Sequence, residues 1–179
     1  VYTECMHGMP SERPVRVAVP VNLRPYFNSI TTKNFFVMVS AEFHPTKEIY
    51  TFEEVLKSVS ESLRSQISRE NLEKLFSYNV SNEKLLAARI VPLFLKNLAM
   101  RYVYTTSALA NTATVTNIGN ISVSEEYRPY VEMFHAFLAM SKGQHLKGTI
   151  CSYGDTLVFS FSYDLVDASV QRGFFRTKI

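Results

Sequence analysis

The sequence has little of what marks a membrane, nucleic-acid-binding or disulfide-stapled protein. Its longest uncharged stretch, 102–124, is dominated by Thr, Ser and Asn, so no membrane span is expected. The 19 basic and 16 acidic residues give a net charge of +3, and the basic residues never gather into a run, which argues against nucleic acid as a partner. The 2 cysteines, Cys5 and Cys151, lie far apart without metal-type spacing, which predicts free thiols and a cytoplasmic protein.

The composition is typical of a single globular domain that covers residues 1–179. Hydrophobic residues make up 46% of the chain and charged residues 20%, with only 6 Gly and 7 Pro, so we expect a compact fold. No basic segment followed by an apolar core opens the chain, so no signal peptide is predicted. The chain starts at Val1 and ends at Ile179 inside an expected helix, and we expect both ends to be cut from a longer polypeptide.

Hydrophobic periodicity predicts two strands and a helix in the first third of the chain. Valines alternate with other residues over 15–22, which predicts a strand with one buried face that ends near Leu23. Residues 34–41 are apolar at both alternating positions, which predicts an interior strand covered on each side. Thr51 and Glu54 form a capping-box pattern ahead of apolar residues at helical spacing, so a helix is expected there.

The rest of the chain predicts helices in the middle and strands afterwards. Helical patterns occupy three segments: 71–77, 83–91 and 92–104. Strand patterns occupy four segments: 113–117, 130–139, 147–153 and 156–163. Gly154 and Asp155 suit a two-residue hairpin turn between the last two strands, and Asp167 suits the cap of a final helix over 166–178. We therefore expect an α/β fold, a mixed β-sheet flanked by helices.

No pattern within the chain predicts a complete catalytic centre. Gly143 and Gly148 have the spacing of a phosphate loop, but Thr149 stands where the phosphate-neutralising Lys must be. Cys5 and His7 are close in sequence, yet nothing nearby completes a zinc site, so no metal is expected.

The 4 histidines have no obvious second group that would fix the tautomer and orientation of a general base. His135 lies within an expected strand beside Phe134 and Phe137, which favours a core histidine over a catalytic one. His44 and His145 lie in turns, where we expect them in solvent.

Four segments, in order, resemble acyltransferases related to chloramphenicol acetyltransferase, a superfamily that includes alcohol acetyltransferases, plant BAHD acyltransferases and peptide-synthetase condensation domains. Residues 17–27, followed by 33–36, are similar to the start of the superfamily's second half. Three later segments are similar to its Ser/Thr-Asn-x-Gly element, its Ser-Tyr before a hairpin and its last helix: 116–119, 149–153 and 170–175. The resemblance is closest to bacterial alcohol-acetyltransferase-like proteins and covers about residues 13–175.

The resemblance implies half of a pseudo-dimeric, chloramphenicol-acetyltransferase-like fold, with a substrate channel between two halves that each carry a sheet and helices. The superfamily's catalytic His-x-x-x-Asp motif belongs to the first half, and this chain has none: His44 is followed at that spacing by Glu48, and His135 by Ala139. We therefore interpret the chain as a C-terminal half without a catalytic residue, whose partner is the N-terminal half of the same protein. The parent is expected to transfer an acyl group from acyl-CoA, its co-substrate, to an alcohol, without a tightly bound cofactor.

The resemblance also assigns roles to individual residues. An Arg at the position matching Arg24 forms an ion pair with the Asp of the histidine motif, so Arg24 is expected to support the missing half; the alternative is a surface Arg in a turn. Five residues are candidates for lining the channel: Asn34, Asn117, Gly119, Ser152 and Tyr153. Each of these has a purely structural alternative, as a turn-closing residue at a strand end or an ordinary residue of a hairpin.

Three functions stay open on these grounds. The first is the channel half of an acyl-CoA-dependent O-acyltransferase, and the second is a non-catalytic binding or assembly module of the same fold. The third is a fragment of a condensation domain that takes its donor from a carrier protein. A His-x-x-x-Asp motif encoded before Val1 would favour an enzyme, and neighbouring carrier modules would favour the third. Apolar surface meant for an absent half predicts self-association of the separated chain.

Overall fold

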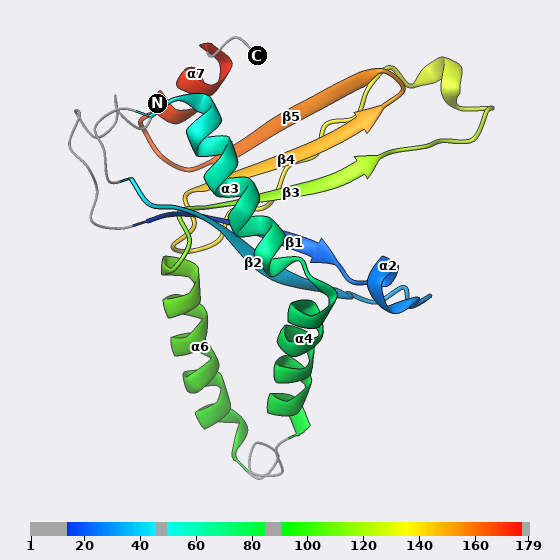
Figure 1. Ribbon diagram of the computed structural model, residues 1–179. Coiled ribbons are helices and arrows are strands. Elements are labelled where there is room, and N and C mark those ends of the chain that lie inside the picture. The colour runs from blue at the N-terminus through cyan, green and yellow to red at the C-terminus, as the bar shows by residue number, and fades with distance from the viewer. Residues whose placement is uncertain (1–13, 46–49, 85–90, 177–179) are drawn as a thin grey trace.

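The computed structural model describes residues 14–45, 50–84 and 91–176. Its centre is a five-stranded mixed sheet of order β2-β1-β3-β4-β5 (Figure 1). The strands are β1 (Val15–Asn22), β2 (Phe36–Phe43), β3 (Ala113–Asn120), β4 (Leu146–Tyr153) and β5 (Thr156–Tyr163). The three inner strands β1, β3 and β4 run parallel to one another, and the two edge strands run antiparallel to their neighbours. The expected α/β class, with helices flanking a mixed sheet, is confirmed.

The helices lie on one side of the sheet or extend beyond it. They are α2 (Arg24–Phe27), α3 (Phe52–Gln66), α4 (Arg69–Lys84), α6 (Leu93–Leu109) and α7 (Ser169–Arg176). Helix α3 crosses one face of the sheet, whereas α4 and α6 extend away from it as two arms (Figure 1). The expected capping box is present, because Glu54 N–H donates to Thr51 Oγ1 over 3.2 Å and Thr51 N–H donates to Glu54 Oε2 over 3.0 Å.

The face under α3, here called the first face, holds the main core. Alternation along β1 and β2 turns their odd-numbered residues toward it, and the buried members of the cluster are Leu23, Val37, Val39 and Leu72. The opposite, second face carries the even-numbered residues of the same strands. There Phe36 and Met38 are 50% and 46% exposed. The expectation that this strand is interior and covered on each side is therefore wrong: β2 starts at Phe36, forms an edge and has one open face.

The C-terminal hairpin follows the sequence expectation closely. Gly154 has φ +56 at the turn between β4 and β5, a left-handed conformation that glycine adopts without strain. Helix α7 packs on the first face of β5, where the Phe174 ring lies 4.7 Å from that of Phe159 and 5.2 Å from that of Phe161, measured between centroids. Asp167 accepts a hydrogen bond from Ser169 N–H over 3.0 Å, and the helix begins at Ser169, later than expected.

The predicted strand over 130–139 does not join the sheet. A short 3-10 turn, η1 (Arg128–Tyr130), precedes it, and residues 131–140 carry no ladder pairing. The segment runs behind β4 and β5, on the face opposite α3 (Figure 1). Two side chains of β4 bind its carbonyls: Cys151 Sγ lies 3.3 Å from Phe134 O, and Lys147 Nζ donates to Ala139 O over 2.7 Å.

The middle helices are longer than their predicted cores. Helix α4 begins at Arg69 and α6 at Leu93, and most of the helix predicted over 83–91, namely residues 85–90, lies outside the described residues. Helix α6 carries mainly apolar side chains, interrupted by Lys96, Asn97 and Arg101, and is exposed along most of its length in the part that the structure describes. Its exposed apolar residues include Leu93, Phe94, Leu98 and Met100.

Candidate functional site

All six predicted site residues lie along one edge of the sheet. Because β1, β3 and β4 are parallel, their carboxyl ends meet there, and antiparallel β2 starts at the same edge. Arg24 follows β1, and Asn34 precedes β2. Asn117 and Gly119 end β3, and Ser152 and Tyr153 end β4. Ligands of open α/β sheets bind beyond the carboxyl ends of the strands, so this placement agrees with a binding role.

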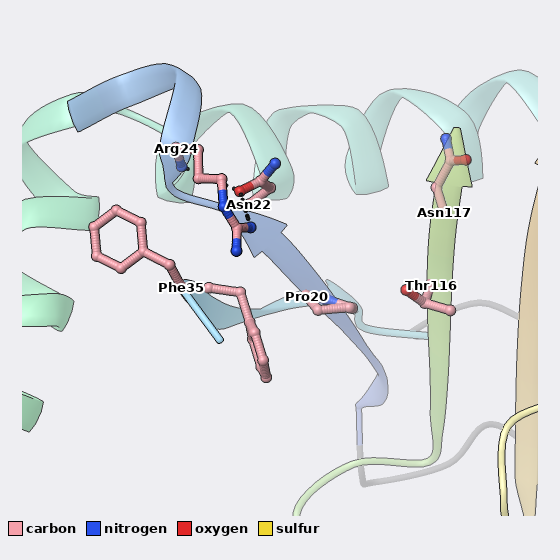
Figure 2. A pocket seen from close by; sticks show the side chains of 7 residues that line it. Pro20, Asn22, Arg24, Phe35, Thr116 and Asn117 are labelled. Carbon is pink, nitrogen blue, oxygen red and sulfur yellow. Dashed lines mark hydrogen bonds between the residues drawn. The ribbon is translucent and has the colours of Figure 1, made fainter. Parts of the chain in front are cut away.

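A hollow of about 400 Å³ opens at this edge between β1 and β3. Its lining residues come from β1, α2, β3 and the start of β2: Pro20, Asn22, Arg24, Phe35, Phe36, Thr116 and Asn117 (Figure 2). It brings together Arg24 and Asn117 of the predicted residues. Asn34 lies next to it and is exposed, whereas Gly119, Ser152 and Tyr153 are not part of its lining.

The hollow exists because β1 and β3 separate. Their parallel pairing covers only Val17 with Ala113 and Ala18 with Thr114, and the strands then diverge toward the carboxyl edge (Figure 1). Beyond the paired stretch, no backbone ladder fills the space between Asn22 on one side and Asn117 on the other. The even-numbered residues Pro20, Phe36 and Thr116 place the floor of the hollow on the second face.

Arg24 is held by three hydrogen bonds that fix its guanidinium. Its Nε donates to Thr31 O over 2.8 Å, one terminal nitrogen to Lys33 O over 2.6 Å and the other to Asn22 Oδ1 over 3.2 Å. These bonds hold the loop between α2 and β2 against the end of β1. Among the described residues Arg24 forms no ion pair with a carboxylate, and its expected pairing with another half stays a prediction.

Asn22 is a lining residue that the sequence analysis missed. Its Oδ1 accepts from both Arg24 N–H, over 3.1 Å, and the Arg24 guanidinium (Figure 2). An Asn two residues before a turn often binds the backbone in this way, so the Asn22-x-Arg24-Pro25 spacing was a usable signal. The apolar lining residues Pro20, Phe35 and Phe36 offered no such signal, because each also fits an ordinary strand.

Asn117 and Gly119 shape the end of β3. Gly119 N–H donates to Asn117 Oδ1 over 2.9 Å, and Gly119 has φ +85, which favours glycine. The pairing with β4 shifts by one residue here, so Ile118 forms a bulge. Because Asn117 Oδ1 is engaged, the amide is oriented and its Nδ2 remains as the hydrogen-bond donor at the rim of the hollow.

Ser152 and Tyr153 contact the segment that follows β3 rather than the hollow. Ser152 O accepts from Ile121 N–H over 2.7 Å, and the Tyr153 ring meets Phe134 edge-on with centroids 5.3 Å apart. Both residues are half-buried. Their predicted role toward a thioester or an acceptor stays a prediction, since neither lines the hollow.

The histidines of the described region lie away from the hollow. His135 is exposed and stacks on Phe137, so the expected core histidine is wrong, because the segment 131–140 covers the sheet with its alternate residues turned outward. His44 is exposed, as expected, with Nε2 3.5 Å from Glu42. His145 is also exposed, but Nδ1 lies 2.8 Å from Asp164 Oδ1, an orienting carboxylate that the sequence analysis missed. Extending the hairpin register one step beyond Leu146 and Tyr163 would have found this pair. His7 and Cys5 lie outside the described residues.

The site therefore offers donors and apolar surface but no proton acceptor suited to general-base work. Within residues 14–45, 50–84 and 91–176, no three His, Cys, Asp or Glu side chains gather as a metal site would require. No helix in the same ranges is both long and apolar enough to cross a bilayer. Comparisons of the chain with protein-family models, with curated proteins and with solved structures found no match.

Proposed function

We propose that the chain is the channel-wall half of an acyl-CoA-dependent O-acyltransferase, with the catalytic base supplied by a complementary half. The observation that supports it is the hollow, which unites residues from segments 17–27, 33–36 and 116–119 that resemble this superfamily. The Arg24 guanidinium, the Thr116 hydroxyl and the Asn117 amide line it together with aromatic and proline surface. Such a lining suits a substrate with a polar reacting centre and an apolar part.

In the proposed reaction, a base outside this chain takes the proton of an alcohol, whose oxygen attacks the thioester carbonyl. The new C–O bond forms, the C–S bond breaks, and coenzyme A leaves as a thiolate that recovers the proton. This chain orients the reactants and excludes water, and Asn117 Nδ2 and the Thr116 hydroxyl are donors for the carbonyl oxygen as it gains charge. Arg24 holds the loop that closes the hollow on the β2 side.

An acyl-transfer assay with acetyl-CoA and simple alcohols tests the proposal, with ester formation measured by mass spectrometry. The chain alone should form no ester above background, and a longer polypeptide that carries the His-x-x-x-Asp motif before Val1 should be active. In that polypeptide, Asn117→Ala should lower kcat/KM by about 10- to 100-fold, corresponding to one lost donor. His145→Ala is the control, because His145 precedes β4 at the opposite edge of the sheet. Ester formation by the chain alone that is lost in His44→Ala or His135→Ala would refute the proposal.

A non-catalytic assembly module is the second candidate, and one observation favours it. In the part of the chain that the structure describes, α6 exposes large apolar side chains, among them Phe94 at 70%, Leu98 at 67% and Met100 at 65%. So much exposed surface suits a protein that works by covering another. A coding sequence that starts at Val1 with no His-x-x-x-Asp segment before it would favour this candidate.

A further inference from the structure

The segments that enclose the hollow carry positive charges and no carboxylate. No Asp or Glu occurs in residues 13–41 or 84–124, which contain every residue of its lining. Among the lining residues Arg24 alone is charged, and within the described ranges it forms no ion pair. Because nothing in the lining balances this charge, the hollow favours a ligand with a negative group.

Arg24 keeps hydrogen-bond donors that the described residues do not use. A guanidinium has five N–H groups, and those of Arg24 that bind Thr31 O, Lys33 O and Asn22 Oδ1 account for three. The remaining two lie one on each terminal nitrogen and can donate to the oxygens of a carboxylate. Since Asn22 Oδ1 already accepts from Arg24, the Asn22 Nδ2 group is a further donor beside the guanidinium. The existing bonds fix both side chains before a ligand arrives, which lowers the entropy cost of binding.

The floor beside Arg24 is apolar and continues past the hollow. Across the ladder of β1 and β2, Asn22 faces Phe36 and Pro20 faces Met38, so these side chains share the second face. Phe36 is 50% and Met38 46% exposed. Apolar surface therefore runs from the position of Asn22 over two strand positions, or about 7 Å. A compact anion such as phosphate would leave this surface in water, whereas an anion with an apolar tail would cover it.

We propose that the hollow binds an amphipathic carboxylate, such as a medium-chain fatty acid. Its carboxylate lies at Arg24 and Asn22, and its chain lies over Pro20 and Phe36 (Figure 2). This goes beyond the proposed acyl transfer and does not rest on it, because binding needs no reaction. The volume of about 400 Å³ lies within the usual range of small-molecule sites. The polar end fixes the orientation of the ligand, and the apolar floor supplies affinity.

A nuclear magnetic resonance titration of the purified chain with sodium octanoate, sodium acetate and octylamine gives the first test. Octanoate should shift the amide signals of Asn22 and bind at least about tenfold more tightly than acetate, since each fully buried methylene adds about fourfold. Octylamine has the same chain and the opposite charge, so it should leave these signals in place. Equal affinities for octanoate and acetate contradict the apolar floor, and equal shifts with octanoate and octylamine contradict the role of Arg24.

A substitution that keeps the loop in place tests the charge. Asn22→Asp retains the Oδ1 atom that accepts from the backbone and the guanidinium of Arg24. It also neutralises Arg24 and removes the Nδ2 donor, so octanoate should bind about tenfold or more weakly. Asn111→Asp is the matched control, because its Oδ1 likewise accepts a bond, from Ser40 Oγ over 3.0 Å, but it precedes β3 at the opposite edge of the sheet. Unchanged binding in Asn22→Asp, or an equal loss in both variants, overturns the proposal.

A second pair of variants tests the floor. Phe36→Ala should weaken octanoate about 3- to 10-fold and leave acetate unchanged, because it removes apolar surface that only the tail covers. Phe94→Ala is the control, since Phe94 is also exposed, at 70%, but lies on α6. Circular dichroism melts show whether all four variants fold. An equal loss of octanoate affinity in Phe36→Ala and Phe94→Ala would mean that octanoate covers exposed apolar surface in general, which refutes a site at the hollow.

Discussion

The side-chain amide of Gln66 pairs with the backbone of Ser40 at two points. Ser40 N–H donates to Gln66 Oε1 over 3.2 Å, and Gln66 Nε2 donates to Ser40 O over 2.7 Å. Nearby, Glu42 N–H donates to Ser62 Oγ over 3.2 Å. Side chains of α3 thus bind the outer edge of β2 as a further strand would, and they block that edge to other chains.

Replacing Gln66 should open this edge. Gln66→Leu removes both bonds to Ser40 while keeping an apolar stem, so we expect the free energy of unfolding to fall by about 1–3 kcal/mol. The freed edge should also raise aggregation on mild heating. Urea denaturation and turbidity measure the two effects. Ser65→Ala, at the exposed position one residue earlier, is the control. It should change the free energy of unfolding by less than about 0.5 kcal/mol. An equal loss in both variants would contradict the role of Gln66.

Arg24 should control the order of the loop between α2 and β2. Arg24→Lys keeps the charge but loses the forked geometry that reaches Thr31 O, Lys33 O and Asn22 Oδ1 together. We expect faster proteolytic cleavage within residues 28–34 and a loss of about 1–2 kcal/mol in stability. Arg128→Lys is the control, since its ion pair with Glu125 is exposed. Unchanged cleavage in Arg24→Lys would show that the loop is ordered by other contacts.

Two glycines should respond differently to alanine. At Gly148 a Cβ would lie 3.0 Å from Phe159 Cζ and 3.3 Å from Val115 Cγ2, so Gly148→Ala must displace the aromatic cluster under α7. We expect a loss of about 1–3 kcal/mol and a changed near-ultraviolet circular dichroism spectrum. At Gly119 nothing lies within 4 Å and only φ +85 opposes a side chain, so Gly119→Ala should lower stability by about 1 kcal/mol without the spectral change. The same spectrum in both variants would refute this distinction.

The Lys147 side chain should hold the C-terminal end of segment 131–140 against the sheet. The side chain is 8% exposed, and Nζ donates to Ala139 O and to Ser141 Oγ, each over 2.7 Å. Lys147→Met keeps the stem and removes both donors, so cleavage by thermolysin should accelerate in residues 138–144. Cys151→Ala removes the other contact, at Phe134 O, and should accelerate cleavage near 132–136 instead. Faster cleavage over all of residues 131–144 in both variants would mean that the two bonds do not act separately.

Local patterns predicted the elements that local interactions determine. The valine alternation of β1, the capping box at Thr51 and the turn at Gly154 depend on residues within a few positions of one another. The period of two over 130–139 reappears in the structure as alternating burial over residues 133–139, although no strand forms there. That pattern could not show that segment 131–140 pairs with no strand of the sheet, because pairing is decided by distant parts of the chain or by another chain.

The candidate site was predictable in its parts but not as an assembly. The resemblance supplied Arg24 and Asn117, which are 93 positions apart and share the hollow only because β1 pairs with β3. No pattern in the sequence states that pairing or where it stops. For the same reason Phe36 and Met38 were expected to be buried: an apolar side chain indicates the need for cover, not whether this chain supplies it.

The short pairing of β1 with β3 divides the sheet into two parts. Only two residue pairs join β1 to β3 in the ladder. The sheet therefore has two well-paired parts, one made of β1 and β2 and the other of β3, β4 and β5. Beyond these pairs, the two parts lie on opposite sides of the space between Asn22 and Asn117. A molecule held in that space would therefore contact both parts of the sheet at once.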